Sequence, residues 1–274
     1  MAISRRTLLK GLVATGVGAA TGVGTYGYLY ERDALRLVRV AVPVAGLAPS
    51  LAGLRVGFIT DVHRSRWVTH DDVVSAVNLL MAAQPDVIVL GGDYVTWSDR
   101  EFVAASAESL GALTAPHGVF AILGNHDDDR DMPAALVARG VQVLKDARTR
   151  LTIRNETLDL AGIRFWTRRP ADIARVLRGA AGTVVLLAHD PRRLAEAAEL
   201  KVPLMLSGHT HGGQVVLPLM GAIAARKFPI LAGIARRGST TLFVSRGVGT
   251  VYVPVRINCP PEVALVTLEA APRA

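Results

Sequence analysis

The chain has 274 residues, half of them hydrophobic, so it can bury a substantial core, and an intrinsically disordered protein is excluded. Its single cysteine, Cys259, excludes an intrachain disulfide and any zinc or iron–sulfur site built from cysteines, and we expect a buried structural thiol there. The net charge is +8, and it falls to +5 (28 basic against 23 acidic residues) when the three basic residues among the first thirty are left out. Because no basic stripe interleaved with aromatic residues occurs, nucleic acid is not an expected partner.

Residues 1–30 have the layout of an export signal. A basic start around Arg5 and Arg6 is followed by an uncharged stretch rich in Gly, Ala and Val. The arginine pair resembles a twin-arginine signal, which implies export of the folded chain by the twin-arginine translocation machinery. The alternative is an ordinary membrane anchor with a chance arginine pair. No strong cleavage site precedes Glu31, so the segment is either removed or kept as a tether. In both cases we expect a periplasmic protein or one on the outer face of the cytoplasmic membrane.

Beyond a connecting segment at residues 31–49, the sequence predicts one α/β domain over residues 50–270. Apolar runs of strand length alternate there with amphipathic stretches, and turn residues separate them. The predicted elements are helices at residues 70–83, 101–112, 132–139, 171–179 and 191–199, a β-hairpin within 151–166 and further strands within 241–269. This order is typical of two mixed β-sheets packed as a sandwich and flanked by helices.

Polar residues follow five of the predicted strands, and they include every candidate ligand of a metal site. The set holds five of the seven histidines and comprises Asp61, His63, Asp93, Asn125, His126, His189, His209 and His211. Because ligands collect at the carboxyl ends of strands in α/β sheets, we expect a single site. Imidazole and carboxylate ligands suit manganese, iron or zinc, and Asp93 is the natural bridge between two divalent metal ions.

Five motifs carry a resemblance to a known family, in order along the chain: Asp61-Val62-His63, Gly92-Asp93, Gly124-Asn125-His126-Asp127, a lone His189, and Gly208-His209-Thr210-His211. Together they resemble the calcineurin-like metallophosphoesterases, and with the arginine pair they resemble the exported bacterial branch of that family. The resemblance implies a four-layer αββα fold. It also implies the metal ligands, which are Asp61, His63 and His211 for one ion, Asn125, His189 and His209 for the other, and Asp93 for both.

The same resemblance implies a metal-dependent phosphoric ester hydrolase. A metal-bound hydroxide would attack phosphorus, and His126, which is left free of metal, would stabilise the phosphoryl charge and protonate the leaving oxygen. Monoesterase, diesterase and lipid-diphosphate hydrolase share these ligands, so the substrate class stays open. A lipid- or nucleotide-linked phosphate would suit an exported, basic protein. The alternative from another class is a non-catalytic metal-binding module of the cell envelope, which would not need His126.

Residues near the motifs allow further predictions. Asp127 either orients a ligand histidine through its second ring nitrogen or is a solvated loop carboxylate. The segment 220–237 mixes apolar and basic residues, so it either dips into an anionic membrane interface or packs its apolar side chains on the core. The remaining conspicuous residues are expected at the surface: Arg64, Arg66 and Trp67 in a solvated loop, and His70 and His117 exposed or as caps.

Overall fold

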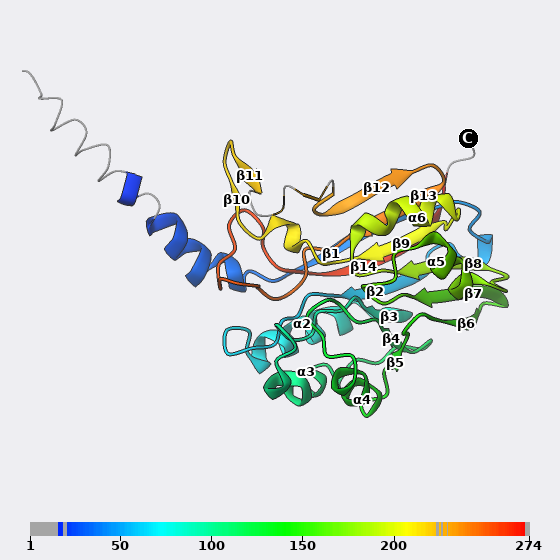
Figure 1. Cartoon of the computed structure of the whole chain (residues 1–274), viewed down its shortest axis with the longest axis horizontal. Coiled ribbons are helices and arrows are strands. Elements are labelled where there is room, and N and C mark those ends of the chain that lie inside the picture. The colour runs from blue at the N-terminus through cyan, green and yellow to red at the C-terminus, as the bar shows by residue number, and fades with distance from the viewer. Residues whose placement is uncertain (1–15, 19–20, 223–224, 226, 229, 272–274) are drawn as a thin grey trace, which may run out of the picture.

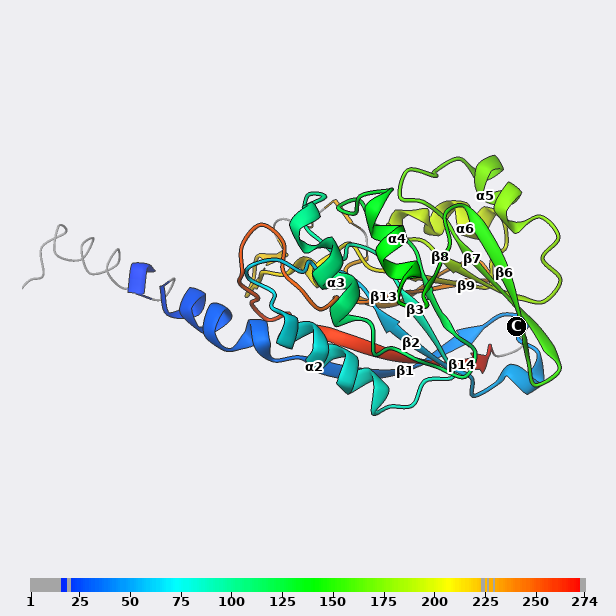
Figure 2. The ribbon, with the colours of Figure 1, turned by 90° about the horizontal axis from the view of Figure 1, so that it is seen from below.

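The computed structural model describes residues 16–18, 21–222, 225, 227–228 and 230–271 (Figure 1). Arg5 and Arg6, on which the export prediction depends, lie outside these ranges. Residues 21–29 form a helix that extends away from the body of the protein (Figures 1 and 2). Within the described ranges, no helix combines the length and the apolar character that crossing a membrane requires.

The first sheet is mixed and has six strands in the order β1-β14-β2-β3-β4-β5. The strands are β1 (Arg36–Val44), β14 (Glu262–Ala270), β2 (Arg55–Ile59), β3 (Val87–Leu90), β4 (Val119–Ala121) and β5 (Gln142–Val143). β14 runs antiparallel to β2, whereas β2, β3, β4 and β5 are parallel to one another. β3 and β4 are apolar and buried along their whole length, as expected for parallel strands covered on both faces.

The second sheet is also mixed, with the order β12-β13-β9-β8-β7-β6. Its strands are β12 (Gly233–Arg237), β13 (Thr240–Val244), β9 (Leu204–Ser207), β8 (Thr183–Leu187), β7 (Glu156–Gly162) and β6 (Ala147–Ile153). The four inner strands are parallel, and an antiparallel strand completes each edge. A separate ribbon pairs β10 (Val216–Leu217) with β11 (Gly221–Ala222). The β6–β7 hairpin turns at Arg154 and Asn155, whose φ values of 52° and 64° are those of a tight hairpin turn.

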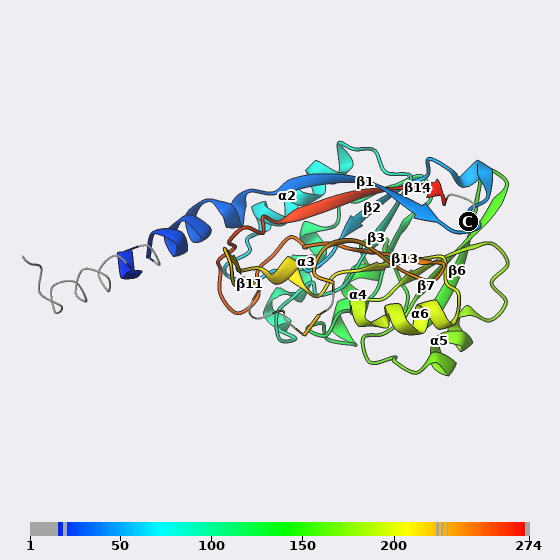
Figure 3. The same cartoon turned by 90° about the horizontal axis from the view of Figure 1, so that it is seen from above.

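Helices cover the outer face of each sheet, so the molecule has four layers (Figures 1 and 3). The first sheet is covered by α2 (His70–Met81), α3 (Val103–Ser109) and α4 (Asp131–Val137), and the second by α5 (Pro170–Leu177) and α6 (Leu194–Glu199). The 3₁₀ turns are η1 (Glu31–Asp33), η2 (Pro49–Leu51), η3 (Arg100–Phe102), η4 (Pro191–Arg193) and η5 (His211–Gly213). The main core lies between the sheets, where Phe58 of β2 meets Phe243 of β13 edge to face.

The predicted sandwich of two mixed sheets flanked by helices is confirmed. α2 begins at the predicted residue because the Thr69 hydroxyl and the Asp72 carboxylate form a capping box. The helices predicted over 101–112 and 191–199 each start with a 3₁₀ turn instead, capped by the carboxylates of Asp99 and Asp190. The hairpin begins at residue 147, earlier than predicted.

The residues predicted to be a connecting segment include β1, which forms part of the first sheet. β1 lies within 31–49 and pairs in parallel with β14 at the sheet edge. Val42 and Val44 of this strand are fully buried in the core between the sheets. In the described part of the chain, the strand that forms hydrogen bonds with β1 is β14, which lies more than 200 residues later in the sequence.

Candidate metal centre

The predicted ligands converge at one end of the two sheets. They follow the carboxyl ends of parallel strands, which are β2, β3 and β4 in the first sheet and β8 and β9 in the second. Because the sheets pack face to face, the loops after these strands meet across the sandwich. All eight predicted site residues therefore lie together, buried except for the half-buried Asn125 and His209: Asp61, His63, Asp93, Asn125, His126, His189, His209 and His211.

Asp61, His63 and His211 form the first group of ligand candidates. Their ligand atoms all lie within 4.8 Å of one another. His211 Nε2 lies 3.1 Å from His63 Nε2 and 3.4 Å from Asp61 Oδ1. The Asp61 carboxylate is oriented by the Thr60 hydroxyl, which donates to Oδ2 over 2.8 Å, and by the backbone N–H of His209.

Asp93, His189 and His209 form the second group, again with ligand atoms within 4.8 Å of one another. Asp93 Oδ2 lies 3.1 Å from His189 Nε2 and 3.5 Å from His63 Nε2, so this carboxylate reaches both groups. That is the position expected of a bridge. The ring of His189 is held by its Nδ1, which lies 2.7 Å from the carbonyl oxygen of Gly91 and leaves Nε2 facing the cluster.

The polar atoms of the cluster fit metal ions. Asn125 Oδ1 is buried and has no hydrogen-bond partner in the described part of the chain, and the buried His189 Nε2 faces the Asp93 carboxylate at 3.1 Å. The Nε2 atoms of His63 and His211 face one another at 3.1 Å, so both can direct a lone pair to one cation when each ring carries its proton on Nδ1. Imidazole, carboxylate and amide oxygen together suit first-row divalent ions. The residues present therefore fit one divalent metal ion in each group.

Backbone strain accompanies most of these ligands. Five of them have a positive φ, namely Asp61 (52°), His63 (48°), Asp93 (56°), His209 (71°) and His211 (51°). Such conformations cost on the order of 1–3 kcal/mol each and persist where the surrounding structure enforces them. Two glycines allow the loops to close: a Cβ on Gly124 would lie 2.0 Å from Asp93 Oδ1, and one on Gly208 would lie 2.1 Å from Asp61 Oδ2.

Burial keeps most of the histidines neutral, which is the form that binds a metal. Desolvation lowers the pKa of His63 and of His209 to about 3, and it lowers the pKa of His211 well below its usual range. His189 differs, because although burial opposes its charge, the nearby Asp93 carboxylate raises its pKa to about 10. Metal binding to the second group must therefore release the proton of His189.

His126 lines the site cavity and forms hydrogen bonds with Asp93 and Trp97 of the loop after β3. Its backbone N–H donates to Asp93 Oδ1 over 2.8 Å, and its Nδ1 accepts from the Trp97 N–H over 3.0 Å. The neutral ring therefore carries its proton on Nε2. Burial also lowers the pKa of this imidazole. The hydrogen bond at Nδ1 leaves Nε2 of His126 as the ring atom available to a ligand in the cavity.

Asp127 has neither of its two expected roles. Its carboxylate accepts hydrogen bonds from the backbone N–H groups of Asp93 (2.8 Å), Tyr94 (2.7 Å) and Gly124 (2.8 Å). It is therefore not a solvated loop group, and its partners are main-chain amides and not a ligand histidine. The contacts join the loop after β3, which carries Asp93, to the loop after β4, which carries Asn125.

The ligand cluster opens into a cavity of about 590 Å³ whose walls are rich in aromatic side chains. The aromatic residues that line it are Trp97, Phe165, Trp166, Phe228 and Tyr252. Two basic residues, Arg192 and Lys227, also line it. Arg192 is paired with Asp190 at 2.7 Å, and Lys227 Nζ lies 5.2 Å from the ring centroid of Phe228.

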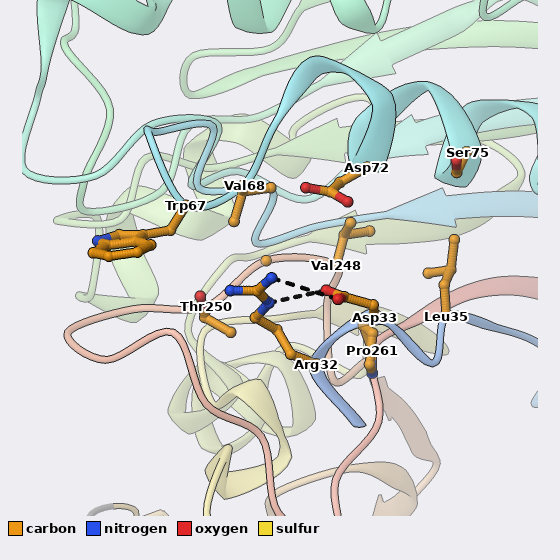
Figure 4. A pocket seen from close by; sticks show the side chains of 11 residues that line it. Arg32, Asp33, Leu35, Trp67, Val68, Asp72, Ser75, Val248, Thr250 and Pro261 are labelled. Atoms are coloured by element: carbon orange, nitrogen blue, oxygen red, sulfur yellow. Dashed lines mark hydrogen bonds and ion pairs between the residues drawn. The ribbon is translucent and has the colours of Figure 1, made fainter. Parts of the chain in front are cut away.

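A smaller cavity of about 90 Å³ lies where the segment after the N-terminal helix meets the start of α2 (Figure 4). Its charged groups are already satisfied, since Arg32 pairs with Asp33 and Asp72 caps α2. Trp67 lines this cavity and is 43% exposed. Arg66 and Trp67 are exposed, as predicted, whereas Arg64 is half-buried and donates to the Val68 carbonyl over 2.7 Å. None of the three lines the site cavity.

The segment 220–237 packs inward over much of its described part. Phe228 lines the site cavity, and Ile230 packs against the outer core of the second sheet. The Leu231 carbonyl accepts a hydrogen bond from the Thr210 hydroxyl over 2.6 Å. Ile223 and Arg226 lie outside the described residues. The packing alternative thus accounts for most of the apolar side chains of this segment that the structure describes.

The buried thiol predicted for Cys259 is confirmed. The side chain is 1% exposed, and Sγ lies 3.1 Å from the carbonyl oxygen of His211. His70 is exposed at the first residue of α2, as predicted, with its Nδ1 2.8 Å from Ser109 Oγ. His117 is half-buried.

Several supporting groups could not be found from sequence motifs. Thr96 Oγ1 lies 3.0 Å from His63 Nδ1 and the Trp97 N–H binds His126, although neither residue belongs to a motif. Arg256 is completely buried behind the first group. Its one signal in the sequence is its position as the only charged residue between Arg246 and Glu262.

Comparison with known proteins agrees with this geometry. The model of the calcineurin-like phosphoesterase family matches residues 54–213. Phosphodiesterase YaeI of Escherichia coli (strain K12) is 31% identical over 281 residues, covering 97% of this chain and 99% of that protein. Metallophosphoesterase YkuE of Bacillus subtilis (strain 168) is 28% identical, covering 98% of each chain. A transmembrane protein with metallophosphoesterase domain from Danio rerio is 30% identical, covering 97% of this chain and 63% of that protein.

The family match covers more than half of the chain and includes all five sequence motifs that carry the ligand candidates. The similarity to the bacterial relatives extends along almost the whole chain. The protein therefore belongs to the calcineurin-like phosphoesterase family and is a metal-dependent phosphoric ester hydrolase.

Proposed function

We propose that the chain hydrolyses phosphodiesters with a bulky apolar or aromatic group on each side of the phosphate, at the outer side of the cytoplasmic membrane. The observation that carries the proposal is the presence of aromatic side chains on two sides of the ligand cluster. Two ions of manganese, iron or zinc are bound in this proposal by a shared Asp93 and by two ligand sets: Asp61, His63 and His211, and Asn125, His189 and His209.

The first aromatic wall stands beside His126. The ring centroids of Trp97 and His126 are 4.5 Å apart, and those of Trp97 and Tyr252 are 5.5 Å apart. Trp97 is 66% exposed and Tyr252 is 77% exposed. Large aromatic side chains left open at the rim of a cavity favour a ligand group that covers them.

The second wall stands beside His209. Phe165 and Phe228 lie 5.2 Å and 5.1 Å from its ring centroid, and Trp166, which is 71% exposed, packs edge-on against Phe165. A monoester has one arm to bury, whereas a diester has two. One aromatic wall beside His126 and another beside His209 therefore support a diester. The name of the Escherichia coli relative, phosphodiesterase, supports the same class.

The chemistry divides between the metal ions and the chain. When bound, two divalent ions neutralise the phosphate oxygens and supply an activated water molecule as nucleophile. His126 donates a hydrogen bond from Nε2 to a phosphate oxygen on which charge develops. Removing one donor of this kind typically lowers the rate by about 10²–10³-fold. The buried Asp93 carboxylate and the half-buried Asn125 side chain line the cavity beside His126.

The proposed location at the membrane rests on the arginine pair of the leader and on exposed apolar side chains. Leu219 and Met220, at the tip of the β10–β11 ribbon, are exposed. The ribbon lies at the same end of the molecule as the helix of residues 21–29 (Figures 1 and 3). A membrane surface would cover these groups and present lipid-linked phosphates to the cavity. The Danio rerio relative, named as a transmembrane protein, supports a membrane setting.

Hydrolysis assays test the activity. The purified chain is stripped of metal, reloaded with manganese, and assayed with bis-p-nitrophenyl phosphate and p-nitrophenyl phosphate beside His126→Ala at matched metal content. We expect metal-dependent turnover that favours the diester and falls in the variant. A preference for the monoester would contradict the proposed substrate class. If soluble aryl diesters are cleaved faster than phospholipids or sugar-lipid phosphates, the lipid assignment fails.

The location is tested separately with residues 1–30 fused to a reporter that folds before export. We expect the reporter outside the cytoplasm with the native leader, and inside with the double variant Arg5→Lys and Arg6→Lys, which keeps the charge. Export of both fusions would show an ordinary signal or anchor instead of a twin-arginine leader.

A further inference from the structure

Arg256 is the largest side chain that is fully buried in the described part of the chain. Four backbone carbonyl groups accept its hydrogen bonds, those of Arg246, Gly247, Gly249 and Cys259. No carboxylate among the described residues forms an ion pair with it at 4.0 Å or less. A buried guanidinium without a carboxylate partner is costly, and an apolar side chain of similar volume often gives a more stable protein. The arrangement therefore needs a reason other than stability.

The first segment that Arg256 holds lies against the backbone of Asp61. The Val248 N–H donates to the Thr60 carbonyl over 3.1 Å, and the Gly249 N–H donates to the Asp61 carbonyl over 2.7 Å. The approach is close, since a Cβ on Gly247 would lie 2.5 Å from Asp61 Cβ. Residues 247–249 thus form the support behind Asp61.

The second segment lies against the turn that contains His211. Cys259 Sγ donates to the His211 carbonyl over 3.1 Å, and the Ile257 N–H donates to the Gln214 carbonyl over 2.9 Å. A Cβ on Gly212 would lie 2.6 Å from Cys259 Sγ, so this contact is also tight. Residues 257–259 thus form the support behind His211.

We infer that Arg256 is a positioning residue that sets the separation of Asp61 and His211. Asp61 follows β2 of the first sheet, whereas His211 follows β9 of the second, so their separation depends on contacts between the sheets. The guanidinium connects the two supports, with carbonyl partners at residues 246–249 on one side and Cys259 on the other. This role rests on the ligand set of the proposed function, because it acts through the first group.

Manganese content of the full-length chain tests the inference without an activity assay. The wild-type chain should retain two manganese ions, and Arg256→Met should bind the ion of the first group about 10–100-fold more weakly, the usual effect of losing a group that orients ligands. At a manganese concentration at which Arg256→Met retains only one ion, addition of His63→Ala should cause no further loss of metal, because His63 belongs to the group that is already empty. Addition of His209→Ala should remove the remaining ion, because that residue belongs to the second group.

The matched control is Ile173→Ala, which removes a fully buried side chain from the outer core of the second sheet and lies in neither support. It should lower the melting temperature and leave two ions bound. If Arg256→Met does not fold, Arg256→Lys decides the question, since lysine keeps the charge and can donate only three hydrogen bonds. Two ions held with wild-type affinity in the Arg256 variants would overturn the role of Arg256. A wild-type chain that binds fewer than two would overturn the ligand set and this inference together.

Discussion

The backbone N–H of Trp97 donates a hydrogen bond to Nδ1 of His126 over 3.0 Å. The bond fixes the orientation of the ring and leaves its proton on Nε2. The next residue, Ser98, donates its N–H to the His126 carbonyl over 2.7 Å. Trp97 and Ser98 have φ values of 53° and 55°, so the loop after β3 holds His126 in place with strained backbone.

Replacement of His126 by alanine should lower kcat by about 10²–10³-fold at matched metal content, because one hydrogen bond to the developing phosphoryl charge is lost. The loss should be similar for esters with good and poor leaving groups, since a neutral ring gives no proton to the leaving oxygen. Rates for p-nitrophenyl and alkyl diesters measure the difference. A loss that grows with the basicity of the leaving group would identify His126 as a proton donor instead.

Removal of the Asp127 carboxylate should destabilise the fold. In Asp127→Ala, the N–H groups of Asp93, Tyr94 and Gly124 lose their acceptor, at about 1–3 kcal/mol for each buried donor left unpaired. We expect the free energy of unfolding, measured with urea, to fall by about 3 kcal/mol or more. Asp129→Ala is the control, because this carboxylate is exposed and its ion pairs contribute about 1 kcal/mol or less. If the two substitutions lowered the free energy of unfolding equally, the role of Asp127 in joining the loops after β3 and β4 would be contradicted.

The free energy of unfolding of the metal-free chain should be highest near pH 6.5. Histidine titration determines how it falls on both the acid and the alkaline side. His189 has a folded pKa of about 10, above its unfolded value, so its contribution is complete below about pH 6.5 and is lost as the pH rises to about 10. His63 and His209 have folded pKa values of about 3, so their contribution is lost as the pH falls from about 6.5 to 3. Burial raises the pKa of Asp61 to about 6 and that of Asp127 to about 7, so these two carboxyl groups oppose the histidines on the acid side. His211, whose pKa burial also lowers, adds to His63 and His209 and keeps the balance with the histidines.

Urea unfolding between pH 4 and 10 in the presence of a chelator measures this profile. The variant His189→Ala should lose the decline on the alkaline side and keep the acid side. If the metal-free wild type became more stable from pH 7 to 9, the raised pKa of His189 would be contradicted.

Removal of either exposed tryptophan of the site cavity should raise KM for bis-p-nitrophenyl phosphate about 3–10-fold, the range expected from one lost aromatic contact. Trp97→Ala and Trp166→Ala remove one contact from each wall. Trp67→Ala is the matched control, because Trp67 is also exposed but lines the smaller cavity. If the two walls each cover one arm of a diester, the same substitutions should raise KM less for p-nitrophenyl phosphate. Equal changes in KM for the two esters would contradict the proposal.

The thiol of Cys259 should not react with a thiol reagent in the native protein, because it is buried and burial raises its pKa. Reaction should begin together with unfolding in a urea titration. A thiol that reacts at zero urea would show that the segment behind His211 opens in the native state.

The position of the site could be predicted from sequence because its ligands are coupled to local structure. Asp61 and Asp93 each follow an apolar run that only a buried strand explains, and His209 follows another. Parallel strands place their carboxyl ends at one edge of a sheet, so residues far apart in sequence meet without any knowledge of side-chain packing. The same reasoning predicted the flanking helices, since α2 has its capping signal in the sequence at Thr69 and Asp72.

The groups that support the site were decided only by the tertiary structure. Asp127 accepts from amides more than thirty residues away, β1 pairs with β14, and Arg256 joins two parts of the β13–β14 loop that lie against ligands from different sheets. A motif specifies the type and spacing of side chains, but hydrogen bonds to the backbone depend on which loops are brought face to face. That arrangement follows from packing the two sheets on one another, and no local stretch of sequence contains it.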